Sequence, residues 1–278
     1  MPRAGSRLEA MDTVCVNIAH RGASAHAPEN TMPAFALALK LGAHMVELDV
    51  HLTADGHVVV HHDDDVLRCT DAAARFAGRH SYFISDFSLA ELRELDAGSW
   101  FAGDARGARI PTLDEVLELA AAHSIFVNIE LKMIPRMYRA LVPRVLDCVE
   151  RAGVQHRVLV TSFDHRALRD VRARSEEVAT GVLSSNPLAD PVAYLAALDA
   201  DAYHPSCEAI GLHAADGGVD VDVIQALREV DKQINVWTCN EPARMQQLMA
   251  AGVTGIITDH PERLQGVLLR RSSPFDPE

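Results

Sequence analysis

Five side chains in the first quarter of this 278-residue chain could do chemistry together: two of its histidines, one arginine and two carboxylates. His20 and Arg21 close an apolar run, Glu47 and Asp49 are two residues apart, and His62 closely follows three valines. Histidines transfer protons near neutral pH, arginine suits an anion, and paired carboxylates suit a cation. This combination is what a metal-assisted phosphoester site requires.

Three later residues extend this set. Glu130 and Lys132 end one mostly apolar run, and Trp237 ends another. If each run is a strand of one barrel, the carboxylates of Glu47, Asp49 and Glu130 meet at its mouth and repel one another. A hard divalent cation with oxygen ligands removes that repulsion. The sequence therefore predicts a site for Mg²⁺ or Ca²⁺ rather than zinc.

The first four residues of this set also have structural alternatives. His20 alone could be a hydrogen-bonded core histidine, but burying the adjacent Arg21 without an anion is costly, which favours a functional site. Glu47 and Asp49 could lie on a solvated strand face, but the residues around them are apolar. Ionised groups in such a strand need a partner, and this again favours a functional role.

Other candidates keep simpler alternatives. Glu130 and Lys132 could form an ion pair only, and Trp237 could be a core residue. His61 is predicted to be structural because it faces away from its neighbour His62. The remaining histidines are expected at the surface or in loops: 26, 44, 51, 57, 80, 123, 156, 165, 204, 213 and 260, with 204 the one at a strand end.

Short β-branched runs alternate with helical patterns along the chain. The predicted strands are 14–19, 45–50, 58–62, 125–130, 158–162, 178–182, 202–204, 234–237 and 255–258. The predicted helices are 31–41, 113–122, 138–152, 165–174, 191–198, 221–230 and 242–250, with one more at the end. Asn30 or Thr31 caps the first helix. Eight strand–helix units predict an α/β fold, the (β/α)8 TIM barrel, with its chemistry at the C-terminal strand ends.

One domain, residues 12–271, is expected to hold the whole barrel. Residues 63–111 are polar, rich in Gly and Arg, and too long for an ordinary loop. We interpret them as an insertion after the second barrel strand, over the C-terminal face. Residues 1–11 and 272–278 are predicted to be flexible tails.

Composition excludes several classes of partner. The net charge is −13, which argues against nucleic acid and against stable docking on anionic lipid. The sequence contains no run of about 18 apolar residues, so no membrane span is predicted. The first residues also lack the apolar stretch of a secretory signal. The five cysteines are scattered and never form a CxxC, which indicates reduced thiols and a cytoplasmic location. Monomer and homodimer both remain open.

The chain resembles the glycerophosphodiester phosphodiesterase family over about residues 14–269. The resemblance rests on gapped motifs: His20-Arg21-Gly22, Pro28-Glu29-Asn30-Thr31, Ala34-Phe35, Glu47-Leu48-Asp49-Val50, Thr53 with Asp55-Gly56, His62-Asp63, Ile110-Pro111-Thr112-Leu113, Ile129-Glu130-Leu131-Lys132, Ser162-Phe163, Val236-Trp237-Thr238 and Gly255-Ile256-Ile257-Thr258-Asp259. It implies a TIM barrel with an insertion and hydrolysis of glycerophosphodiesters to sn-glycerol 3-phosphate and an alcohol.

The residues fit a mechanism compatible with this resemblance. His20 and His62 are the expected acid and base, in either order. Arg21 and Lys132 are expected to bind phosphate, and Trp237 to pack on the glycerol carbons. The cation is assigned to Glu47, Asp49 and Glu130. The nucleophile, the glycerol 2-hydroxyl or water, stays open, as do the alcohol and the metal.

Rival functions come from three classes. The first is a lysophospholipase D or sphingomyelinase D-like phosphodiesterase on the same barrel, which needs an apolar channel. The second is a non-catalytic barrel that binds polyol phosphates, and the intact histidines and carboxylates speak against it. The third is a purely structural or interaction protein, for which the sequence offers no repeat, coiled coil or charged tail.

Overall fold

Nine strands form one sheet in the computed structural model, which describes residues 15–103, 105–212 and 218–271. In the order in which they pair, the strands are β1 (Val16–Ala19), β9 (Gly255–Thr258), β8 (Gln233–Val236), β7 (Ala202–Pro205), β6 (Ala179–Ser184), β5 (Val158–Ser162), β4 (Phe126–Leu131), β2 (Met45–Leu52) and β3 (Val58–Val60). β1 also pairs with β2, with Ile18 opposite Met45, and this contact closes the ring. The predicted (β/α)8 barrel is therefore confirmed, and β3 is an antiparallel addition to β2 outside it.

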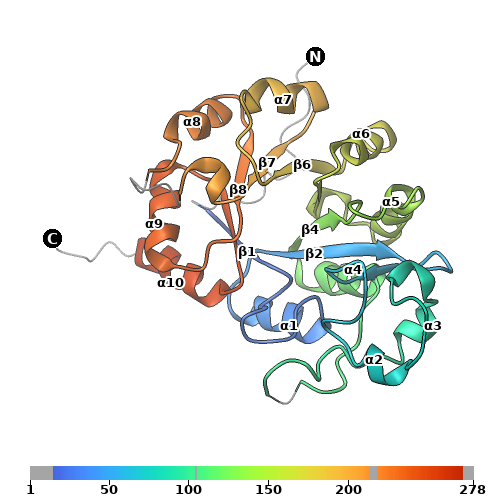
Figure 1. The fold of residues 1–278 in the computed structure, drawn as a ribbon. Helices are drawn as coiled ribbons and strands as arrows, with labels where there is room; N and C mark the ends of the chain where they lie inside the picture. The colour runs from blue at the N-terminus through green and yellow to red at the C-terminus, as the bar shows by residue number, and fades with distance from the viewer. Residues whose placement is uncertain (1–14, 104, 213–217, 272–278) are drawn as a thin grey trace.

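Helices between the strands surround the barrel (Figure 1). They are α1 (Met32–Lys40), α4 (Leu113–His123), α5 (Leu141–Ala152), α6 (His165–Arg174), α7 (Pro191–Leu198), α8 (Val221–Glu229), α9 (Pro242–Ala251) and α10 (Pro261–Arg271). The Thr112 side chain accepts from the Glu115 amide, and the Glu115 side chain accepts from the Thr112 amide, so this capping box begins α4. α5 begins three residues later than predicted, because residues before Leu141 belong to a loop that carries Tyr138 to His51.

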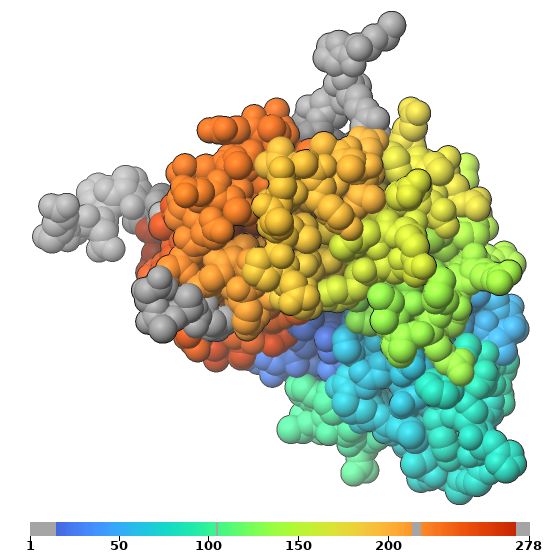
Figure 2. Space-filling model, turned by 45° about the horizontal axis from the view of Figure 1, so that its top comes forward, coloured from blue at the N-terminus to red at the C-terminus, as the bar shows by residue number. Residues whose placement is uncertain are grey.

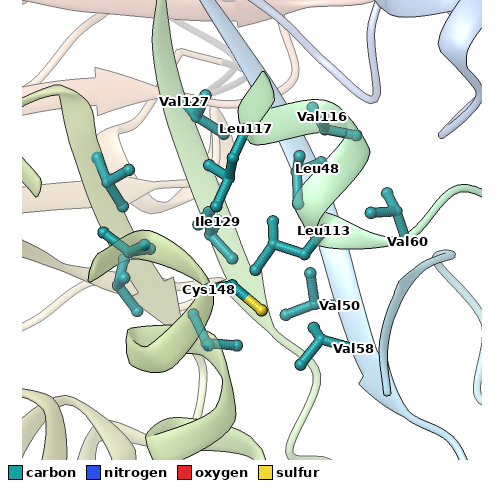
Figure 3. Packing of buried hydrophobic residues seen from close by; sticks show 14 of the residues in the cluster. Leu48, Val50, Val58, Val60, Leu113, Val116, Leu117, Val127, Ile129 and Cys148 are labelled. Carbon is teal, nitrogen blue, oxygen red and sulfur yellow. The ribbon is translucent and has the colours of Figure 1, made fainter. Parts of the chain in front are cut away.

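The barrel strands are buried on both faces, which explains their nearly continuous apolar sequence. On β2, Val46, Leu48 and Val50 face outward and join a large core with α4 and β4 (Figure 3). The alternate residues of β2 are Met45, which packs on β1 and β9, and the acids Glu47 and Asp49. Alternation along the strand thus places the acids inside the barrel.

The insertion has a small core of its own. It carries α2 (Ala72–Arg75), a 3-10 turn (Ile84–Asp86) and α3 (Leu89–Leu92), which lie to one side of the barrel next to α1 and α4 (Figure 1). Its buried side chains pack on Val59 of β3: Val66, Ala72, Ile84, Phe87, Leu92, Leu95, Ala97 and Ile110. Arg68 of the insertion contacts Asp63 and also Glu29, which lies in the loop after β1. The placement of the whole insertion over the C-terminal face stays a prediction.

The predicted flexible tails, 1–11 and 272–278, and residues 12–14 of the predicted domain lie outside the described residues. Within the described ranges, no helix combines the length and the apolar character that crossing a bilayer demands.

Candidate active site

Three carboxylates meet at the C-terminal ends of β2 and β4. Asp49 lies opposite Glu130 in the paired strands, and Glu47 lies two residues before Asp49. One oxygen of each of the three lies within 4.8 Å of the others. Glu47 and Asp49 are 4% and 1% exposed, so water screens their repulsion poorly. The structure thus brings together the carboxylates that strand-end position singled out.

The charges of these acids are unequal. Burial raises the pKa of Glu47 well above its usual range, and the charges of Asp49 and Glu130 raise it further. Burial also raises the pKa of Glu130, against the opposing charge of Lys132. Burial disfavours the charge on Asp49 too, but Lys132 and Arg21 hold the pKa of that carboxyl well below its usual range. Oxygen donors under this repulsion fit a hard divalent cation.

Two cations lie against this cluster. Lys132 Nζ lies 2.7 Å from Glu130 Oε1 and 3.2 Å from Asp49 Oδ1, so the ion pair considered as an alternative is formed. Arg21 Nη1 donates to Glu29 Oε1 at 2.9 Å. Arg21 Nε is buried, lies 3.5 Å from Asp49, and has no hydrogen-bond partner among the described residues. Arg21 Nε therefore forms an ion pair with Asp49 but no hydrogen bond with any residue that the structure describes.

Each histidine of the set is held by an aspartate. His20 Nδ1 lies 2.6 Å from Asp259 Oδ1, and His62 Nδ1 lies 2.7 Å from Asp63 Oδ1. A carboxylate at Nδ1 fixes the ring and leaves Nε2 as the nitrogen that can exchange protons. The charge on His62 also lowers the pKa of Asp49, which places this histidine close to the carboxylate cluster.

Further groups hold the two aspartates. Asp259 accepts from Ser24 Oγ at 3.0 Å and from Asn240 Nδ2 at 2.7 Å. Asp63 accepts from Arg68, whose Nη2 also donates to Glu29 Oε1 at 2.7 Å. Glu29 also pairs with Arg21. Arg68 therefore connects Asp63, which holds His62, to Glu29, which holds Arg21. This link joins the insertion to the loop after β1.

Trp237 lies one residue past β8 and is partly buried. Its indole N–H donates to the His204 carbonyl at 2.8 Å, and its ring meets Phe163 edge to face at 5.7 Å between centroids. Trp237 also packs on the apolar layer inside the barrel. The alternative prediction, that Trp237 is a core residue, therefore holds in part. Phe163 is 37% exposed, which leaves an aromatic surface near the strand ends.

Comparison with known proteins identifies the family. The model of the glycerophosphoryl diester phosphodiesterase family matches residues 20–263. The chain belongs to this family. A glycerophosphodiester phosphodiesterase from Caldanaerobacter subterraneus subsp. tengcongensis is 37% identical over 247 residues, which cover 89% of this chain and 95% of the relative. Members of the family are hydrolases, so this chain is a phosphodiester hydrolase of the glycerophosphodiester type.

Solved structures agree with the family. A phosphodiesterase from Oleispira antarctica, in complex with the product sn-glycerol-3-phosphate, has a TM-score of 0.76 at 29% identity and covers 90% of this chain and 95% of its own. A glycerophosphodiester phosphodiesterase from Agrobacterium tumefaciens has a TM-score of 0.72 at 26% identity, with 90% and 98% covered. The barrel of this glycerophosphodiester phosphodiesterase family member therefore has experimentally determined counterparts.

The structure decides several sequence predictions around the site. Of the two residues predicted to cap α1, Thr31 is the cap, and the buried Asn30 amide instead donates to Asp49 Oδ2 at 2.8 Å. His51 and His204 were expected at the surface or in loops but are 2% and 0% exposed. His51 lies on β2, where it contacts the His62 carbonyl at 3.2 Å. The prediction for His61 is confirmed, because it is buried beside the Asp65 carbonyl.

Sequence reasoning assigned no role to Glu29, Arg68, Asn240 or Asp259. A signal existed for Asp259, which follows β9 as His20 follows β1. No comparable signal exists for Arg68, because its partners depend on the path of the insertion.

Proposed function

We propose that the chain hydrolyses glycerophosphodiesters to sn-glycerol 3-phosphate and a free alcohol, with one divalent cation, Mg²⁺ or Ca²⁺. One observation carries this proposal: a buried cluster of three carboxylates lies beside two histidines that are each oriented by an aspartate. The relative from Oleispira antarctica holds sn-glycerol-3-phosphate as its product, which supports the same product here.

The cation is assigned to Glu47, Asp49 and Glu130, whose oxygens are close enough to share one ion. When bound, such a cation neutralises charge on the phosphate and favours attack at phosphorus. Asn30 donates to Asp49, and the Arg21 amide donates to Glu47 Oε2 at 2.9 Å. These hydrogen bonds fix the orientation of both carboxylates before any ligand arrives.

Arg21 and Lys132 are assigned to the phosphate. Both carry positive charge into the carboxylate cluster, and Arg21 Nε makes no hydrogen bond with the described residues. Arginine can contact two phosphate oxygens with its planar fork, whereas lysine acts as a point charge. Trp237, with Phe163 beside it, offers an apolar surface to the glycerol carbons.

His20 and His62 are assigned to proton transfer. One removes the proton from the nucleophile as the new P–O bond forms. The other donates a proton to the leaving alkoxide as the bond between phosphorus and the alcohol oxygen breaks. A water nucleophile gives sn-glycerol 3-phosphate directly, whereas the glycerol 2-hydroxyl gives a cyclic phosphate, which a water molecule then opens to sn-glycerol 3-phosphate. Each transfer contributes roughly 10²–10⁴-fold to the rate.

The test uses a panel of glycerophosphodiesters with choline, ethanolamine, glycerol or inositol as the alcohol. Release of sn-glycerol 3-phosphate is measured after EDTA treatment and after return of Mg²⁺, Ca²⁺ or Mn²⁺. We expect loss with EDTA, recovery with at least one metal, and loss in His20→Ala and His62→Ala variants. Full activity after chelation would refute the metal assignment, and no release from any substrate under any metal would refute the function.

A lysophospholipase D activity is the second candidate because the loop after β4 exposes apolar side chains. Ile134 and Met137 are 58% and 62% exposed, shortly after Lys132 of the site. An acyl chain needs such a surface. Comparing turnover of glycerophosphocholine with that of lysophosphatidylcholine separates the two activities. We expect the former to be faster.

We also propose a cytoplasmic location, supported by five cysteines that are scattered along the chain and never form a CxxC. Cell fractionation with an antibody to the protein tests this, and recovery with secreted or membrane proteins would contradict it.

A further inference from the structure

A second group of metal-ligating side chains lies outside the carboxylate cluster. His26 belongs to the loop between β1 and α1, and His260 and Glu262 lie where β9 passes into α10. His26 Nε2 lies 3.0 Å from Glu262 Oε1, and His260 Nδ1 lies 3.2 Å from the same oxygen. One donor atom of each of the three residues lies within 4.8 Å of the others. Segments from the two ends of the barrel chain therefore converge on one point.

The surface shows the same convergence. In Figure 2 the dark blue surface of the early chain borders the red surface of the last helices. The rings of His26 and His260 meet edge to face, with centroids 5.4 Å apart. Glu262 Oε2 is buried and has no hydrogen-bond partner among the described residues. A buried carboxylate oxygen that receives no hydrogen bond costs free energy unless it binds a cation.

The donor chemistry differs from that of the carboxylate cluster. Two imidazole nitrogens and one carboxylate favour a borderline metal such as Zn²⁺, whereas Mg²⁺ and Ca²⁺ prefer oxygen alone. Zinc bonds of about 2.0–2.1 Å in a tetrahedron separate neighbouring donors by roughly 3.3 Å. The two separations between a histidine nitrogen and Glu262 Oε1, 3.0 and 3.2 Å, are near this value, and one donor nitrogen of each histidine lies within 4.8 Å of the other.

We propose that His26, His260 and Glu262 form a second metal site, which binds Zn²⁺ or a similar borderline divalent cation. Three protein ligands leave a fourth position for water. The ion joins the loop after β1 to the start of α10, next to the contact in which the Ala25 amide donates to the Asp259 carbonyl at 3.2 Å. The site does not depend on the proposed reaction.

The alternative is a hydrogen-bonded cluster without metal, in which both histidines donate protons to Glu262. Arg263 Nε, 3.8 Å from Glu262 Oε1, is a competing cation. The two arrangements differ in what they predict for added metal. A hydrogen-bonded cluster binds no zinc, whereas a metal site gains stability from zinc because the ion binds the folded chain preferentially.

The experiment must separate the two metal sites. A Glu47→Gln/Glu130→Gln variant removes oxygen ligands from the carboxylate cluster, and calorimetry then measures Zn²⁺ binding. Cobalt(II) absorption reports coordination geometry in the same variant. If that variant fails to fold, wild-type protein in excess Mg²⁺ serves instead. His26→Ala and Glu262→Gln are introduced into whichever background is used.

We expect one equivalent of Zn²⁺ to bind, a rise of about 5 °C in Tm at saturating zinc, and visible absorption typical of tetrahedral cobalt(II). His26→Ala and Glu262→Gln should weaken zinc binding by at least about 100-fold. His57→Ala is the matched control, since His57 also faces an aspartate, Asp55, at 3.3 Å but has no third metal-ligating side chain beside it among the described residues. Zinc binding unchanged by His26→Ala, or absent from the parent, would overturn the proposal.

Discussion

Glu47 and Asp49 share one strand face but carry opposite protonation preferences. Burial and neighbouring acids raise the pKa of Glu47, whereas Lys132 and Arg21 lower that of Asp49 despite its burial. Without a cation, these surroundings favour the protonated form of Glu47, and glutamine resembles that form. Asp49 is ionised and balances the buried cations beside it. The two acids should respond differently to neutralisation.

We expect Glu47→Gln to keep the free energy of unfolding within about 1 kcal/mol of wild type in EDTA. Activity should fall by at least about 100-fold, because a cation ligand is lost. Asp49→Asn should cost about 3 kcal/mol or more, since it leaves Lys132 and Arg21 less well paired. Urea denaturation and substrate turnover measure both effects. Equal destabilisation by the two changes would contradict this account.

Arg68 holds the aspartate that orients His62. The His62 hydrogen bond and Arg68 together keep the pKa of Asp63 well below its usual range. Arg68→Gln should raise that pKa, move the acidic limb of the activity–pH profile to higher pH, and lower kcat roughly tenfold with little change in KM.

Arg75→Gln is the control, because Arg75 pairs with Asp71 on the same insertion. An unshifted pH profile in Arg68→Gln would show that Arg68 does not act through Asp63.

Residue type and position predicted the members of the site better than their supports. Polar groups at the ends of apolar strands cost free energy unless they have a partner or a ligand. This makes four residues recognisable in the sequence: His20, Glu47, Asp49 and Glu130. Arg68 is an ordinary surface residue in sequence, and its contacts with Glu29 and Asp63 depend on a loop of irregular path.

Among the elements, the loop after β1 has a demanding backbone. Arg21 and Asn30 have φ values of 56° and 55°, and Gly22 has 81°. A Cβ at Gly22 would lie 2.7 Å from the Ala34 carbonyl carbon, in the first turns of α1. Only glycine allows this close approach, which fixes the Arg21 amide against Glu47.

Gly22→Ala should lower the free energy of unfolding by about 3 kcal/mol, through backbone strain and overlap with α1. Activity should fall in the remaining folded protein, since Arg21 moves with the loop. Gly78→Ala is the matched control: Gly78 has a φ of 82°, but apart from its chain neighbours no described residue has an atom within 4 Å of the added Cβ. Its cost should be about 1–2 kcal/mol, with activity retained. Equal costs at both positions, measured by urea denaturation, would argue against the overlap.

Element types followed from the sequence more readily than loop conformations did. Strand β5 and helices α6 and α7 have the predicted bounds, because β-branched runs and helix caps are local signals. The choice between Asn30 and Thr31 as cap could not be made locally. The Asn30 side chain donates to Asp49 on β2 and so does not cap the helix.

At the scale of the whole barrel, the interior is partly polar. Thr161 donates to Asn128 at 3.0 Å, and His204 contacts Asn235 at 3.0 Å. Burial lowers the pKa of His204 to about 3, and burial likewise lowers that of His51 to about 3. Both histidines are therefore neutral in the folded barrel, while the unfolded chain protonates them near pH 6.5.

This difference predicts how stability depends on pH. Between pH 6.5 and pH 3 the unfolded chain binds protons that the folded chain does not, so the free energy of unfolding falls as pH falls. Each histidine contributes about 1.4 kcal/mol per pH unit, or roughly 2 kcal/mol between pH 6.5 and pH 5. Above pH 6.5 neither contributes. Urea denaturation at pH 7.5 and pH 5 measures the loss.

His204→Gln should remove about half of that histidine-dependent loss, whatever its effect at pH 7.5. His123→Gln, on the exposed end of α4, is the control and should leave the pH dependence unchanged. An identical slope in His204→Gln and wild type would contradict the neutral, buried state of His204.

His20 and its aspartate, Asp259, are 239 positions apart in the chain. They follow β1 and β9, the first and last strands of the barrel, which pair with each other. During synthesis, a ribosome releases β9 only after every other barrel strand has emerged. A growing chain that already contains the carboxylate cluster still lacks the support of His20. If His20 transfers protons as proposed, we expect turnover to begin only when the last strand docks and Asp259 reaches His20.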